Sequence, residues 1–130
     1  MQAAETDPAT VLRGLGTLTA EVAPRIAPLL LLLVTAADGD PTLTELHAEL
    51  ENARLARMTH IARNLAAKTP LRRNVDDTAD IMWTYSSPEL YRLLVLTRGW
   101  TPDRYGRFVA ESLVDALLEH DPSPHTSTPG

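Results

Sequence analysis

The apolar residues of this chain fall on helical faces rather than on alternating positions. No stretch alternates apolar and polar residues as a half-buried strand does. The pattern, together with its start and stop signals, predicts an all-α fold with helices over residues 8–22, 24–37, 42–67, 75–85, 88–98 and 102–119. Pro24 and Pro28 leave open whether the first two helices are separate or form one kinked helix, because a proline inside a helix bends its axis.

Five of the predicted helices begin beside a capping residue. Four of the ten prolines directly follow a side chain that can accept a hydrogen bond from the first turn, in the pairs Asp7-Pro8, Asp40-Pro41, Ser87-Pro88 and Thr101-Pro102. The fifth start is at Asn74, where two carboxylates follow in the positive end of the helix dipole. The stretch Thr42 to Glu45 has the spacing of a capping box, so the third helix begins at either Asp40 or Thr42.

The two ends of the chain carry little apolar surface. We therefore expect residues 1–6 and 121–130 to be disordered and residues 7–120 to form the folded domain. The apolar run from Leu29 to Val34 is shorter than the roughly 20 residues of a bilayer span and lacks the basic flank of a signal peptide. We interpret it as a central helix buried on all sides, in a cytoplasmic protein without a membrane partner.

The composition limits the class of protein. A chain of 130 residues forms one domain with one core. It contains no cysteine, which excludes disulfides, thiolate metal sites and cysteine nucleophiles. With 12 basic and 17 acidic residues the net charge is −5, so the whole chain has no positive field that would hold a nucleic-acid backbone.

The last two predicted helices are apolar on two sides. A small domain has one core, so the second side indicates a homodimer in which the two helices of each copy form a four-helix bundle. The alternative is a domain compact enough to cover both sides itself. The candidate interface residues are Leu90, Tyr91, Leu94, Tyr105, Phe108, Val109, Ser112 and Ala116.

The stretch from Asn74 to Tyr105, NVDDTADIMWTYSSPELYRLLVLTRGWTPDRY, resembles the C-terminal regulatory domain of TetR-family transcriptional regulators, actinobacterial-type members especially. The stretch VAPRIAPL that begins at Val22, the Asp40-Pro41 start of a long Arg-rich helix and the order of the helices agree with it. This resemblance implies a helical bundle of about six helices that binds a small effector and dimerises through its last two helices, as a repressor domain does.

A complete regulator of this family also has an N-terminal helix-turn-helix module that enters the DNA major groove. The residues before Asp7 are too few for such a module and contain no Arg or Lys. We therefore expect contact with DNA only through a module missing from this chain. The alternative function is a headless interaction protein that binds no ligand and heterodimerises with a full-length homologue as a dominant negative.

The expected effector pocket lies among the middle helices, where apolar walls meet a few polar groups. The inner face of the third helix carries Arg54 and Arg57. Three interpretations of these cations are open: they contact a bound anion, they extend past the apolar face to water, or they pair with an internal carboxylate such as that of Asp80. The candidate ligand-binding residues are Arg54, Arg57, Met58, Ile61, Met82 and Trp83.

Enzymatic and metal-binding interpretations find little support. His47 and Glu51 stand one turn apart, as do His60 and Asn64, but neither pair has a third ligand at matching spacing. The Gly14-Leu15-Gly16 stretch lacks the third glycine and the preceding strand of a phosphate-binding loop, and we interpret it as a close helix contact or a weak spot in the helix. We therefore expect a protein that is not an enzyme and uses no metal or cofactor.

Overall fold

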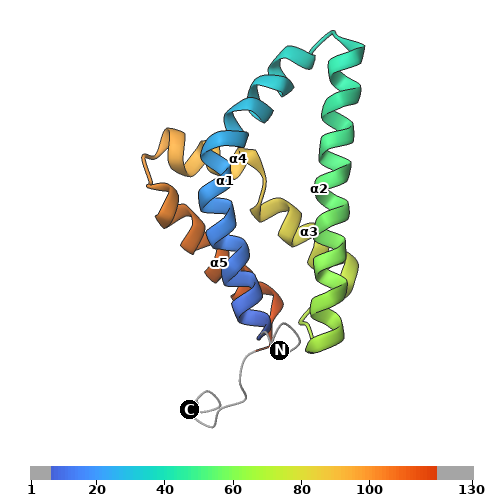
Figure 1. Ribbon diagram of the computed structural model, residues 1–130, viewed down its shortest axis with the longest axis vertical. Helices are drawn as coiled ribbons and strands as arrows, with labels where there is room; N and C mark the ends of the chain where they lie inside the picture. Colours follow the sequence, from blue (N-terminus) through green and yellow to red (C-terminus); the bar gives the residue numbers. More distant parts are fainter. Residues whose placement is uncertain (1–6, 120–130) are drawn as a thin grey trace, which may run out of the picture.

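The structure, a computed structural model, describes residues 7–119 (Figure 1). Its elements are α1 (Pro8–Ala37), α2 (Pro41–Lys68), α3 (Val75–Tyr85), α4 (Pro88–Tyr91), the π-helical segment η2 (Arg92–Thr97) and α5 (Pro102–Leu117). Within these residues there is no β-strand, only an isolated bridge between Leu71 and Leu118. The prediction of an all-α fold is confirmed. The disorder predicted for 1–6 and 121–130 lies outside the described residues.

All five predicted caps accept a backbone hydrogen bond from the first turn of their helix. The acceptors and donors are Asp7 with Thr10 (3.3 Å), Asp40 with Thr42 (3.0 Å) and Leu43 (3.2 Å), Asn74 with Asp77 (2.7 Å), Ser87 with Leu90 (3.4 Å) and Thr101 with Arg104 (3.1 Å). The third predicted helix thus begins after Asp40 and not after Thr42. Gly39 and Gly99, at φ +81° and +78°, supply the left-handed turns that follow α1 and η2.

The first two predicted helices form the single helix α1, which is the second of the two alternatives that Pro24 and Pro28 left open. Pro24 and Pro28 both lie inside this helix. Each removes one backbone hydrogen bond, which bends a helix without ending it when the neighbouring turns remain intact. Figure 1 shows α1 changing direction along its upper half, before the turn that leads into α2.

The predicted helix over residues 88–98 is α-helical only in its first turn. From Arg92 to Thr97 the backbone widens into a π-helix, and the bond from Arg98 N to Leu93 O (3.1 Å) has the five-residue spacing of that form. A wider turn changes the angle between successive side chains. The side chains from Arg92 to Thr97 therefore do not follow the 100° spacing of the α-helix that the sequence predicted here.

The core lies where α5 packs antiparallel to α1 while α2 and α3 cover the other side. Leu12, Leu65, Met82 and Leu113 are among its fully buried side chains. The loop before α3 is fastened to the end of α5, because Arg72 N donates to Leu117 O at 2.8 Å.

The sequence predicted that the apolar run near the end of α1 is buried on all sides. This prediction is wrong. Leu29 is 61% exposed and Leu32 is 64% exposed. The reason is length: α1 has 30 residues and spans about 45 Å, whereas α5 has 16 and spans about 24 Å, so α5 cannot cover the far half of α1. By length and composition alone α1 would be able to cross a membrane, although a core helix meets the same criteria.

Candidate functional site

A cavity of about 270 Å³ lies where α1, α2, α4 and α5 meet. Its apolar wall is a stripe along one face of α1, at the spacing of three and four residues that keeps side chains on the same side of a helix. The members of this stripe are Leu15, Leu18, Thr19, Val22, Ala23, Ile26, Ala27 and Leu30. The opposite wall comes from α2 and consists of Leu50, Glu51, Arg54, Arg57 and Met58.

Arg54 is the buried charge of this cavity, with 9% of its surface exposed. Its Nε and one terminal nitrogen donate to the Glu51 carboxylate, the closer contact being 2.8 Å, and its other terminal nitrogen donates to Trp83 O at 2.7 Å and Ser86 Oγ at 2.8 Å. The guanidinium also lies 5.1 Å from the centre of the Trp83 ring. The protein itself therefore neutralises and orients this cation.

The hydroxyl groups of the cavity wall also have internal partners in most cases. Thr19 donates to Leu15 O at 2.8 Å, and Ser86 donates to Trp83 O at 3.2 Å while accepting from Arg54. Ser87 caps α4. Groups already paired in this way offer little to a bound molecule, because a new bond would replace an existing one.

Tyr91 and Tyr105 form a buried aromatic corner of the cavity. Their rings meet edge to face with centroids 5.6 Å apart, and the residues are only 5% and 1% exposed. Neither phenol hydroxyl hydrogen-bonds to any residue within 7–119. Burial raises the pKa of Tyr105 to about 12, against the opposing effect of the Arg54 charge.

Three of the six predicted ligand-binding residues line the cavity, namely Arg54, Arg57 and Met58. The other three do not line it. Ile61 and Met82 pack in the core, and Trp83 lies behind Arg54, stacked on its guanidinium. These residues do not reach the cavity, because α3 packs directly against α2 and covers the face of α2 that they contact. Arg54 pairs with Glu51 rather than with the suggested Asp80.

The α1 stripe and the two tyrosines are among the cavity residues that were not predicted from the sequence, together with Leu50, Glu51, Ser86, Ser87 and Pro88. The stripe was visible in the sequence as apolar or small residues at spacings of three and four from Leu15 to Leu30. Tyr91 and Tyr105 were assigned to a subunit interface instead, because their burial inside the single chain depends on how α1 packs against α5.

The structure also corrects three residues of the candidate interface. Tyr91, Tyr105 and Val109 are 5%, 1% and 0% exposed in the single chain and offer no surface to a second copy. The others remain at least partly accessible: Leu90, Leu94, Phe108, Ser112 and Ala116. On the adjoining η2, the exposed apolar side chains are Leu93 (46%) and Leu96 (55%).

The exposed side of α5 carries a small aromatic cluster. Phe108 meets Trp100 edge to face with ring centroids 5.6 Å apart and lies 6.2 Å from Tyr85. The Arg104 guanidinium stacks 3.8 Å from the Trp100 ring centre. This cluster, together with Leu93 and Leu96, leaves apolar surface unpartnered on the last helices of the described chain.

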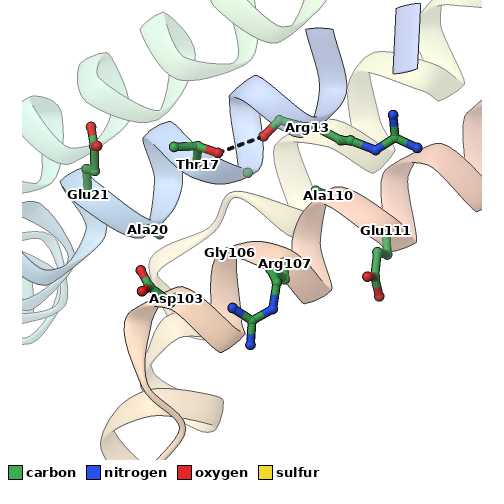
Figure 2. Close-up of a pocket in the computed structure, with 10 residues that line it drawn as sticks. Arg13, Thr17, Ala20, Glu21, Asp103, Gly106, Arg107, Ala110 and Glu111 are labelled. Atoms are coloured by element: carbon green, nitrogen blue, oxygen red, sulfur yellow. Dashed lines mark hydrogen bonds between the residues drawn. The ribbon is translucent and has the colours of Figure 1, made fainter. Parts of the chain in front are cut away.

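A second hollow, of about 430 Å³, flanks the crossing of α1 and α5 (Figure 2). Small residues floor it, with Gly106 and Ala110 on α5 facing Gly16 and Ala20 on α1. Its rim mixes basic with acidic side chains, namely Arg13, Arg107, Glu21, Asp103 and Glu111. Such a mixture creates no field of one sign, and the hollow is best explained by the closeness of the two helices.

No group of three or more metal-ligating side chains occurs among residues 7–119. Comparisons with protein-family models, curated proteins and solved structures gave no match to this chain. The candidate site therefore rests on its own geometry: an apolar cavity with one neutralised cation and two buried phenols.

Proposed function

We propose that this chain is the effector-binding and dimerisation domain of a TetR-like transcriptional regulator, taking a small, largely apolar molecule into the cavity between α1 and α2. The observation that carries the proposal is the cavity itself, with apolar walls and few polar groups. Contact with an operator belongs to a helix-turn-helix module that residues 7–119 do not supply.

The exposed apolar surface of the last helices supports the dimeric part of the proposal. Leu93, Leu96 and Phe108 are each more than a third exposed and lie on η2 and α5. A second copy related by twofold symmetry would cover this patch with its own equivalent. The dimer would then bury surface that a lone chain leaves in water.

The cavity and this surface share structural elements. Tyr91 lines the cavity and directly precedes η2, and Tyr105 lines it from α5. A ligand that contacts both tyrosines acts on the two helices that would meet the partner subunit. Binding would then favour one arrangement of the subunits over another, which is the linkage a regulator requires.

A thermal-shift screen of small apolar molecules, combined with light scattering on the eluted chain, tests the proposal. We expect a dimer and a melting temperature that rises with ligand concentration. Ala23→Leu, which fills the cavity from α1, should abolish the shift, whereas Ala53→Leu on the exposed side of α2 should retain it. A monomer at tens of micromolar contradicts the proposal. A dimer that no ligand stabilises favours the headless interaction protein instead.

A further inference from the structure

The polar groups of the cavity indicate which chemical class of ligand it takes. The Glu51 carboxylate and the Arg54 guanidinium are paired with each other at 2.8 Å, and the Arg54 nitrogens also donate to Trp83 O and Ser86 Oγ. A ligand carboxylate would have to compete with Glu51 for this cation. A ligand ammonium would have to compete with Arg54 for Glu51.

Arg57 is the second cation of the cavity wall, but it is exposed. Solvent screens an exposed charge, so its attraction for an anionic ligand is weak. The charged groups of the cavity thus favour neither an acid nor an amine strongly.

The Tyr91 and Tyr105 hydroxyls are different, because they belong to buried residues and have no hydrogen-bond partner in the part of the chain that the structure describes. Buried polar groups in proteins nearly always have such a partner. Among these residues, the one side-chain polar atom that is both fully shielded and unpaired is Trp83 Nε1. Each tyrosine hydroxyl therefore retains some accessible surface, and the cavity that both residues line supplies it.

We infer that the cavity selects an uncharged, mainly apolar molecule carrying one hydrogen-bonding oxygen, such as an ester, ketone or alcohol, and that Tyr91 and Tyr105 bind this oxygen. The inference rests on the proposed function of the cavity. The α1 stripe would hold the apolar part of the molecule, and the phenols, being neutral donors, would bind a neutral acceptor without the cost of desolvating a charge.

Three probes with the same alkyl chain test the inference by calorimetry on the full chain: methyl octanoate, octanoate and octylamine. We expect methyl octanoate to bind most tightly. Tyr91→Phe and Tyr105→Phe should each weaken its binding by about threefold to tenfold, the worth of one neutral hydrogen bond. Tyr85→Phe is the matched control, because Tyr85 lies outside the cavity against Phe108, and it should bind the ester as the unmodified chain does.

Stability measurements on the same variants keep the test independent of folding defects. A hydroxyl without a protein partner can be removed without loss, so both cavity variants should melt at or above the temperature of the unmodified chain. If Tyr105→Phe fails to fold, this expectation is contradicted, and Tyr91→Phe with the order of the three probes still decides the ligand class.

Different contrary results would overturn the inference alone or the proposed function as well. Tighter binding of octanoate or octylamine than of the ester overturns the inference alone, as does ester binding that neither cavity variant weakens. If none of the three probes binds the unmodified chain, the ligand-binding function fails, and the inference fails with it.

Discussion

Gly16 on α1 and Gly106 on α5 allow the backbones of these two helices to come into direct contact. A Cβ at Gly16 would lie 2.5 Å from the Gly106 carbonyl oxygen, and a Cβ at Gly106 would lie 2.6 Å from the Gly16 carbonyl oxygen. Neither distance is sterically allowed, and neither obstacle is a flexible side chain. The crossing visible in Figure 2 therefore depends on glycine at both positions.

Gly16→Ala should lower the free energy of unfolding by about 1 to 3 kcal/mol, because separating two packed backbones costs more than the gain in helix propensity. Gly14→Ala is the matched control. It lies in the same helix with nothing within 4 Å of its Cβ position, so alanine there should raise the free energy of unfolding by about 0.5 to 1 kcal/mol. Urea denaturation measures both, and equal effects of the two substitutions would contradict the close contact.

Glu51→Gln should destabilise the fold by about 1 to 3 kcal/mol, because it leaves the nearly buried Arg54 guanidinium without a countercharge. Glu49→Gln changes the same group two positions earlier, where the side chain is exposed, and should alter stability by less than about 0.5 kcal/mol. Thermal and urea unfolding of the two variants give the comparison. Similar stabilities would show that the ion pair contributes no more than a surface contact.

The pKa of Tyr105 predicts a stability that falls in alkali. Its value is about 12 in the folded chain and 10.0 without the effects of the fold, so between these values the unfolded chain loses this proton while the folded chain keeps it. The contribution of Tyr105 to the free energy of unfolding is fully present below about pH 10. It decreases as the pH rises toward 12, by about 1 kcal/mol at about pH 11.

Tyr105→Phe isolates this contribution, because it removes the titrating group and leaves the ring. The stability of the unmodified chain relative to Tyr105→Phe should therefore decrease between about pH 9 and about pH 11, as measured by urea unfolding at each pH. A difference that is constant over this range would mean that the phenol titrates alike in both states.

The start of every helix with a predicted cap could be read from the sequence because capping is local. Asp40 needs only the amides two and three residues ahead of it, and Asn74 only the third. The continuity of α1 through Pro24 and Pro28 is not local, since it depends on whether the turns around each proline are held by packing. The π-helical turn after Tyr91 has no local signal that we recognise.

The site was predictable only in part for a similar reason. Arg54 was a candidate because a cation on an apolar helical face needs a partner, and the choice of Glu51 over Asp80 depended on where α3 lies. The side of α5 that faces α1 is fixed by the contact of Gly16 with Gly106, which requires knowledge of both helices at once. That contact places Tyr105 inside the chain rather than at an interface.

The proposed subunit interface predicts that single charges on the exposed patch of η2 and α5 will separate the dimer. Leu96 is 55% exposed and Phe108 is 36% exposed, so Leu96→Glu and Phe108→Glu should leave the fold intact while burying an unpaired carboxylate at the twofold contact. We expect light scattering to give a monomer for both variants at a concentration where the unmodified chain is a dimer. Leu29→Glu is the matched control, because Leu29 is 61% exposed on α1, away from these helices, and it should remain dimeric. Monomers from Leu29→Glu and dimers from the other two would place the interface on α1 instead.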